Sequence, residues 1–259
     1  MTAPKSPPET SNPTLMLALA TVGFALCFWA WNLISPLGSV FGDEFGLSAF
    51  QQSLVVAVPV VVGSLGRIPV GALTDRLGAR VMFPAVSALT IVPVLFVGLF
   101  GTTYPAVLIG GFFLGIGGTA FAVGVPFVNA WYPPARRGLA LGIFGMGTGG
   151  TAISAFTTVQ LADAFGRATP FVIVAVALAA YTVISRIFLR DAPGRTIASG
   201  SMLTRTWATL KRPVTLKLSW VYAIAFGGFV AFSVYLPTYL TNAYGLDHSD
   251  AALRTAGFV

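Results

Sequence analysis

One residue of this chain has a chemistry that its surroundings do not explain. Arg67 lies in the stretch GSLGRIPVGALTDRLGAR, which begins as an apolar helix at Gly63 and ends in a charged turn at Arg80. A charged side chain at the centre of a bilayer costs roughly 2.5–3.5 kcal/mol, so Arg67 needs a partner. Asp75 is eight residues further, about 12 Å along a helix, which places it at the membrane surface. We therefore expect the partner of Arg67 to be an anionic substrate.

The other reactive residue types form no catalytic or metal site. The sequence contains no nucleophile and base pair, no cluster of metal ligands and no phosphate-binding loop. Its one histidine, His248, lies beside Asp247 and Asp250 and is interpreted as part of a solvated loop. Its one cysteine, Cys27, lies in an apolar run and is interpreted as a packing residue. The sequence predicts no enzyme, no metal and no cofactor.

The composition places Arg67 in a polytopic membrane protein. Of the 259 residues, 56% are hydrophobic and only 9% are charged, whereas soluble domains have about 25% charged residues. The formal net charge of +7 could indicate a nucleic-acid partner. That interpretation is rejected because the basic residues are confined to alternate loops. The predicted surroundings are a lipid bilayer.

Long apolar runs predict seven membrane-spanning helices and the start of an eighth. After a polar tail, residues 1–13, which we expect to be disordered, the predicted spans are residues 14–41, 50–73, 81–100, 105–130, 138–161, 168–189 and 216–241, and the eighth begins at about residue 249. The fold class is therefore all-α. The predicted domains are a half of six helices at 14–189, a basic linker at 190–213 and the start of a second half at 214–259.

The distribution of Lys and Arg predicts the orientation. The tail and the loops after the second, fourth and sixth spans carry nearly all of them: Lys5, Arg76, Arg80, Arg136, Arg137 and seven more from residue 186 to residue 217. The alternate loops carry only Arg167 and Arg254. Because cytoplasmic loops are enriched in Lys and Arg, the tail and the linker are predicted to be cytoplasmic, in a cell (inner or plasma) membrane.

The turn after the second span resembles the loop motif G-x-L-x-D-R-x-G-x-R of the major facilitator superfamily. The matching residues are Gly71, Leu73, Asp75, Arg76, Gly78 and Arg80. The glycines permit a tight turn, and the charged side chains can make bonds between helix ends that break and form again as two halves rock. The resemblance implies a fold of two six-helix halves and a conformational-switch role for Gly71, Asp75, Arg76, Gly78 and Arg80.

Three further stretches resemble the nitrate/nitrite porters of that superfamily. They are the glycine-rich run 115–124, the loop WYPPARRG at 131–138 and the glycine-rich run 142–151. The chain departs from the family pattern at Thr148, where the porters usually have asparagine. From the residues alone, the second glycine run has two interpretations, close helix packing or backbone contact with a small anion.

The resemblance implies a substrate site of a defined shape. The site residues that it assigns are Arg67, Phe121, Tyr222 and Phe226, together with Gly147, Thr148 and Gly149. A planar guanidinium can donate parallel N–H groups to two oxygens of a planar anion, which a lysine ammonium cannot do. Aromatic rings above and below would exclude water and larger tetrahedral anions. This shape suits nitrate or nitrite.

Three functions follow as alternatives. The first is transport of nitrate, nitrite or both by alternating access, with anion exchange slightly preferred to proton symport because no Asp, Glu or His lies deep in a predicted span. The second is transport of another small anion, such as a carboxylate or cyanate. The third is a truncated half that does not transport. We expect the chain to be the N-terminal portion of a longer protein, with a second arginine contributed by the eighth span, and to be inactive alone; its oligomeric state is left open.

Overall fold

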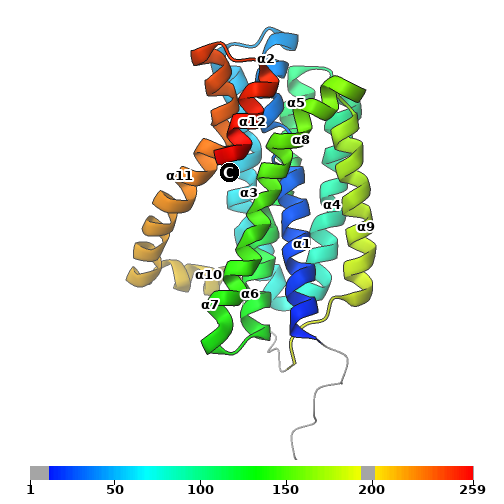
Figure 1. The fold of residues 1–259 in the computed structure, drawn as a ribbon. Helices are drawn as coiled ribbons and strands as arrows, with labels where there is room; N and C mark the ends of the chain where they lie inside the picture. Colours follow the sequence, from blue (N-terminus) through cyan, green and yellow to red (C-terminus); the bar gives the residue numbers. More distant parts are fainter. Residues whose placement is uncertain (1–11, 194–201, 259) are drawn as a thin grey trace, which may run out of the picture.

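The computed structural model describes residues 12–193 and 202–258, and within these ranges every regular element is a helix. The predicted all-α fold class is thereby confirmed. The predicted tail up to residue 11 and the linker residues 194–201 lie outside the described residues. With η denoting a 3₁₀-helix, the elements labelled in Figure 1 are α1 (Pro13–Trp31), η1 (Ser35–Leu37), α2 (Gly38–Phe45), α3 (Ala49–Leu77), α4 (Ala79–Phe100), α5 (Tyr104–Leu114), η2 (Gly115–Thr119), α6 (Ala120–Trp131), α7 (Pro134–Gly145), η3 (Met146–Gly149), α8 (Gly150–Phe165), α9 (Thr169–Phe188), α10 (Met202–Leu210), α11 (Pro213–Tyr244) and α12 (His248–Phe258).

Seven stretches of the described residues are long and apolar enough to cross a membrane, and each overlaps one predicted span. They are Pro13–Phe45, Ala49–Leu77, Ala79–Phe100, Tyr104–Trp131, Pro134–Phe165, Thr169–Phe188 and Pro213–Tyr244. The first, fourth and fifth stretches each combine two α-helices with a short 3₁₀ segment. The number and order of the predicted spans are therefore confirmed.

Some boundaries differ from the prediction. Residues 74–77, predicted as part of a turn, continue α3, and the chain changes direction only at Gly78, which has a φ of 84°. Glycine adopts this left-handed conformation without steric cost, so one residue suffices for the turn. α7 starts at Pro134, before the predicted Gly138, because proline fits the first helical turn. α10 lies within the predicted linker, where the sequence predicted no helix.

α1 is the central helix of the bundle in the part of the chain that the structure describes. Figure 1 shows α1 with α4 and α9 on one side and α8 on the other. Phe24 and Phe28 on α1 are fully buried. α8 approaches α1 closely because Gly150 has no side chain: a Cβ there would overlap the carbonyl oxygen of Ala25. Small residues that let backbones approach are the usual device for packing helices in lipid.

α11 is attached to the bundle along only part of its length. Its buried residues lie between Val230 and Pro237, whereas the segment 213–225 is almost entirely exposed. Figure 1 shows the first part of α11 standing away from the other helices and its second part returning to them beside α2 and α12. The attachment includes a hydrogen bond of 2.6 Å from Ser35 Oγ to the carbonyl oxygen of Val234. A space therefore remains between the first part of α11 and the bundle.

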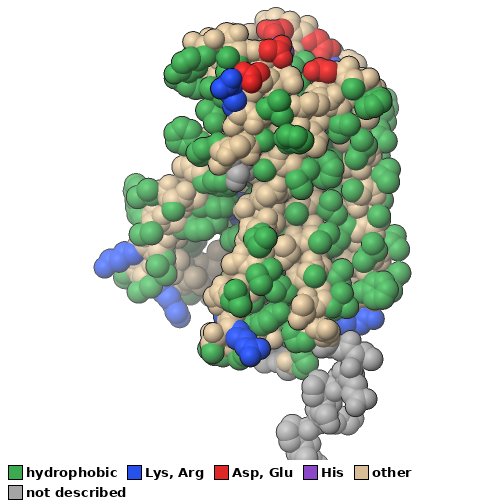
Figure 2. Space-filling model, viewed as in Figure 1, with side chains coloured by type: hydrophobic (Ala, Val, Ile, Leu, Met, Phe, Trp, Pro, Cys, Tyr) green, Lys and Arg blue, Asp and Glu red, His purple; other side chains and the backbone are tan. Residues whose placement is uncertain are grey.

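The charged side chains separate toward the two ends of the bundle. On the face drawn in Figure 2, acidic groups gather at the end formed by α2 and α12, and most Lys and Arg lie at the opposite end. We call the end formed by α2 and α12 the acidic end; it carries Asp43, Glu44, Asp247 and Asp250. We call the opposite end, which carries the α3–α4 and α6–α7 turns, the basic end. The two arginines of the acidic end are paired: Arg167 donates to both Glu44 oxygens at 2.7 and 2.8 Å, and Arg254 to Asp250 at 2.9 Å. The separation follows the loop alternation in the sequence.

Candidate functional site

A cavity of about 500 Å³ lies between α3 and residues 222–235 of α11. Its wall is mostly apolar. The residues that line it are Trp31, Ala57, Val60, Val61, Ser64, Arg67, Tyr222, Ala223, Phe226, Gly227, Val230, Ala231, Val234 and Tyr235. In Figure 2 it corresponds to the hollow between the lower part of α11 and the bundle. Such a cavity, apolar with a few convergent polar groups, is typical of a small-molecule site.

Arg67 is held in a fixed orientation at this cavity. Its Nε donates a hydrogen bond of 3.2 Å to the carbonyl oxygen of Gly118. The guanidinium carbon lies 5.4 Å from the ring centre of Phe121 and 5.3 Å from that of Phe226, so the cation is next to two aromatic faces. Within the described residues no carboxylate forms an ion pair with Arg67. The positive charge is therefore available to an anion from outside the chain.

The aromatic residues assigned to the site by the resemblance gather around Arg67. The rings of Tyr222 and Phe226, four residues apart on α11, stack with centres 4.9 Å apart and planes inclined by 15°. The Phe121 ring stacks on both, with centre distances of 6.3 Å to Tyr222 and 6.0 Å to Phe226. Tyr222 and Phe226 line the cavity, and Phe121 lies beside them. The structure thus brings together predicted residues from the second, fourth and seventh spans.

Glycines allow the Arg67 side chain to reach the backbone of η2. A Cβ on Gly115 would lie 2.8 Å from the Pro59 carbonyl oxygen, and a Cβ on Gly118 would lie 3.3 Å from the Cα of Gly63. Both distances are tighter than ordinary contacts, so larger residues would push α3 and η2 apart. The 3₁₀ form of η2 accompanies its glycines, which have low α-helix propensity. The backbone of the first glycine run, residues 115–124, thus contacts the Arg67 side chain.

Trp31, the last residue of α1, packs against both α3 and η2. Its indole Nε1 donates a hydrogen bond of 3.0 Å to the carbonyl oxygen of Pro59. The same nitrogen would lie 3.1 Å from a Cβ on Gly118, so the indole fills the space that the glycine leaves. Trp31 also lines the cavity, although only 4% of its surface is exposed. The sequence leaves two interpretations of the FWAW run at 28–31, packing or cavity lining, because nothing in an apolar run shows which aromatic residue faces a cavity.

Gly147, Thr148 and Gly149 are not among the residues that line the cavity. The Thr148 hydroxyl donates to the carbonyl oxygen of Gly145 at 2.9 Å. A Cβ on Gly147 would lie 2.9 Å from Phe24 Cγ, which fits the packing interpretation of this glycine run. A Cβ on Gly149 would meet nothing within 4 Å. Contact of these three residues with an anion stays a prediction.

Ser64 and Tyr235 are further polar residues of the cavity wall. Ser64 precedes Arg67 by three residues and so shares its face of α3, a spacing that could have identified it in the sequence. Ser53, on the same helix, donates its hydroxyl to the carbonyl oxygen of Ala49 at 2.9 Å. Within the described residues the Ser64 hydroxyl has no such bond. It is a donor that a bound anion could use.

The predicted switch residues all lie at or near the basic end. Gly78 ends α3, and the next residues start α4. The backbone N–H of Arg80 donates to Asp191 Oδ1 at 3.2 Å, so the turn is fastened to the segment that follows α9. A Cβ on Gly71 would lie 3.8 Å from the Ala122 Cβ, an ordinary contact distance. Asp75, Arg76 and Arg80 have exposed side chains. Their conformational role stays a prediction.

The arrangement of the helices is that of solved membrane transporters. The chain matches a bacterial homolog of the human lysosomal transporter Spinster, in an inward-facing and unoccupied conformation, with a TM-score of 0.70 and 19% identity over 95% of this chain and 59% of that one. It matches the D-xylose-proton symporter with a TM-score of 0.62 and 16% identity over 95% of this chain and 65% of that one. At these identities the likeness shows the fold. The class that this fold defines is an all-α membrane protein with the helix arrangement of solved transporters.

Within this class, residues 20–259 match the Major Facilitator Superfamily, and the chain belongs to that superfamily. It is 51% identical over 244 residues to the probable nitrate/nitrite transporter NarK2 of Mycobacterium tuberculosis, which covers 93% of this chain and 62% of the relative. It is 38% identical over 245 residues to the nitrite extrusion protein of Bacillus subtilis, which covers 95% of this chain and 61% of the relative. The predicted resemblance to nitrate/nitrite porters is confirmed. The chain spans less than two thirds of the length of these relatives.

Proposed function

We propose that this protein transports nitrate, nitrite or both across a cell membrane by alternating access. The observation that carries the proposal is Arg67, a guanidinium without a carboxylate partner among the described residues, which lies beside the rings of Phe121 and Phe226 at a cavity. Its planar fork can donate two parallel N–H groups to two oxygens of a trigonal anion. The named functions of the relatives support this choice of anion.

The cavity wall favours a small monoanion. Arg67 is the one charged residue among those that line it. A monoanion would neutralise this charge, whereas a dianion would bring an unpaired negative charge into an apolar site, which is costly. The Ser64 hydroxyl and the Tyr222 phenol supply further donors for the remaining oxygen. The rings of Phe121, Tyr222 and Phe226 stack on one another beside Arg67 and give that side of the site an apolar wall.

We further propose exchange of nitrate against nitrite in preference to proton symport. The residues that line the cavity include no carboxylate and no imidazole, so the described part of the site has no group that commonly carries a proton. An exchanger needs only that the loaded site reorient. We place the basic end in the cytoplasm, because Lys and Arg gather there, and this opens the cavity toward the cytoplasm.

Substrate competition in proteoliposomes tests the substrate. With the complete protein, unlabelled nitrate and nitrite are expected to compete with uptake of isotopically labelled nitrate, whereas sulfate is not. Equal competition by formate or cyanate would indicate a transporter of other small anions. Absence of nitrate uptake and of nitrate binding would refute the proposed substrate.

A second measurement tests the coupling. Vesicles preloaded with nitrite are expected to release it when nitrate is added outside, with no imposed pH gradient. Release that requires a pH gradient and no external anion would refute exchange and leave the substrate assignment intact.

A further inference from the structure

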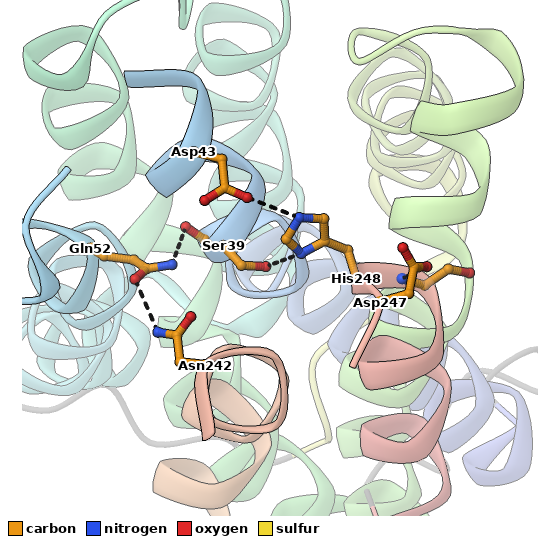
Figure 3. Close-up of polar contacts among 8 residues, drawn as sticks. Ser39, Asp43, Gln52, Asn242, Asp247 and His248 are labelled. Atoms are coloured by element: carbon orange, nitrogen blue, oxygen red, sulfur yellow. Dashed lines mark hydrogen bonds and ion pairs between the residues drawn. The ribbon is translucent and has the colours of Figure 1, made fainter. Parts of the chain in front are cut away.

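His248 joins α12 to α2 at the acidic end. It is the first residue of α12, and its ring nitrogens both face α2: Nδ1 lies 2.7 Å from Ser39 Oγ and Nε2 lies 3.2 Å from Asp43 Oδ2. Figure 3 shows the imidazole between these two side chains. From the sequence, His248 is expected to be part of a solvated loop. The structure corrects this, because the ring bridges two helices more than 200 residues apart in sequence.

A second set of polar contacts joins α11 to the bundle near the same end. Asn242 donates to Gln52 Oε1 at 3.4 Å, and the Gln52 amide donates to the carbonyl oxygen of Gly38 at 3.0 Å, as Figure 3 also shows. Gln52 is 7% exposed and lies inside the contact, whereas Asn242 is at its exposed edge. The contacts with α11 and α12 thus close the acidic end with directional polar bonds, while the first part of α11 stands apart toward the basic end.

The closed contact leaves some polar groups unsatisfied. Among the described residues, the Thr238 and Thr241 hydroxyls on α11 and Gln160 Oε1 on α8 are buried without a hydrogen-bond partner. A buried polar group without a partner costs about 1–3 kcal/mol, a cost that water would remove on opening. Opening of the acidic end would let water hydrogen-bond to these groups, so the bonds of the closed contact can be exchanged for bonds to water.

We propose that His248, Ser39 and Asp43 form a latch that holds the acidic end closed while the cavity at Arg67 is open toward the basic end. The latch rests on the proposed alternating-access transport. In the opposite state α12 moves away from α2, and the imidazole, hydroxyl and carboxylate are hydrated. Loss of the latch shifts the population toward the state that is open at the acidic end, because only the closed state contains these bonds.

The chain offers a matched control for the latch. Arg254 and Asp250 form an ion pair of 2.9 Å on the same helix and at the same end, but both partners belong to α12. Removing this pair changes the charge of α12 without cutting a bond to α2. An effect of His248→Ala that is absent in Arg254→Ala can therefore be attributed to the bonds between α12 and α2.

Thiol labelling tests the latch. The reporter is Val230→Cys, at a cavity-lining position that is 8% exposed, and the native Cys27 is fully buried. A membrane-impermeant thiol reagent is added to the complete protein in vesicles, on the side that the acidic end faces. His248→Ala, Ser39→Ala and Asp43→Asn are each expected to speed labelling about three- to tenfold, the loss of one or two hydrogen bonds. Arg254→Ala is expected to leave the rate unchanged.

The outcomes separate the latch from the proposed function. Unchanged labelling in all three latch variants would overturn the latch, as would an equal increase in Arg254→Ala, which would indicate general loosening of α12. Labelling requires no anion, so either result leaves nitrate binding at Arg67 untouched. Conversely, a parent protein that binds no nitrate would refute the proposed function, while the labelling rates would still decide whether the latch exists.

Discussion

At the scale of single residues, we expect the proposed site to depend on the orientation of Arg67 as well as on its charge. The bond from its Nε to the Gly118 carbonyl fixes the plane of the guanidinium, and the neighbouring rings restrict the directions from which an anion can approach. A lysine at this position would keep the charge but not the planar fork.

Arg67→Lys is therefore expected to weaken nitrate binding roughly 10- to 100-fold, the loss of a charge-assisted hydrogen bond of about 1.5–3 kcal/mol. Binding to the purified complete protein is measured by titration calorimetry. Arg167→Lys is the matched control, because Arg167 pairs with Glu44 at the acidic end, away from the cavity. Near-normal nitrate binding by Arg67→Lys would show that the anion binds elsewhere.

The Ser64 hydroxyl provides a second test at this scale. Ser64→Ala is expected to raise the KM for nitrate about three- to tenfold, since a hydrogen bond contributes about 0.5–1.5 kcal/mol. Ser53→Ala, which removes a hydroxyl bonded to the helix backbone, is expected to leave KM unchanged. Equal effects of the two substitutions would mean that α3 was disturbed and that Ser64 is no ligand.

At the scale of elements, glycines decide which helices approach each other. Gly150 sets the contact of α8 with α1, and the glycines of η2 set its contact with α3. Not every glycine of these runs has this role, since a Cβ on Gly149 would meet nothing within 4 Å. Adjacent residues therefore allow packing and ligand contact to be tested separately.

Gly150→Ala is expected to destabilise the protein by about 1–3 kcal/mol, the usual cost of overpacking. Gly149→Ala is expected to leave thermal stability in detergent unchanged or slightly raised, because alanine favours helix. If Gly149→Ala keeps its stability but loses nitrate affinity, the prediction that this residue contacts the anion is supported. A destabilised Gly149→Ala together with a stable Gly150→Ala would contradict the packing described.

The sequence predicts the elements and the charged centre of the site, but only part of its wall. The seven spans follow from long apolar runs, and Arg67 follows from the cost of a charge in lipid. The aromatic partners needed the family resemblance, because single aromatic residues in apolar runs do not reveal which face they occupy. The contacts of Trp31 and His248 could not be predicted, since the partners of each are brought near only by tertiary packing.

At the scale of the whole molecule, the two ends differ in charge. The α3–α4 and α6–α7 turns carry basic residues, and the acidic end carries carboxylates whose two neighbouring arginines are paired. This asymmetry is the physical basis for the proposed orientation. The proposed latch and the predicted switch residues therefore lie at opposite ends of the bundle.

The orientation is tested with two cysteine positions in intact and permeabilised cells. Thr102→Cys lies in the exposed α4–α5 loop at the acidic end, and Arg136→Cys lies near the start of α7 at the basic end. An impermeant thiol reagent is expected to label Thr102→Cys in intact cells and Arg136→Cys only after permeabilisation. The reverse pattern would place the basic end outside.

The indole of Trp31 gives the protein an optical reporter of its own. Its Nε1 is bonded to the Pro59 carbonyl, and the ring forms part of the wall that Arg67 shares. An anion that enters the cavity changes the electric field at this ring and hence its fluorescence emission. The chain has five tryptophans, so the signal from this one is the part of the nitrate-induced spectral change that disappears in Trp31→Phe. Occupancy of the cavity could then be followed by light alone, in detergent, with no membrane, isotope or label.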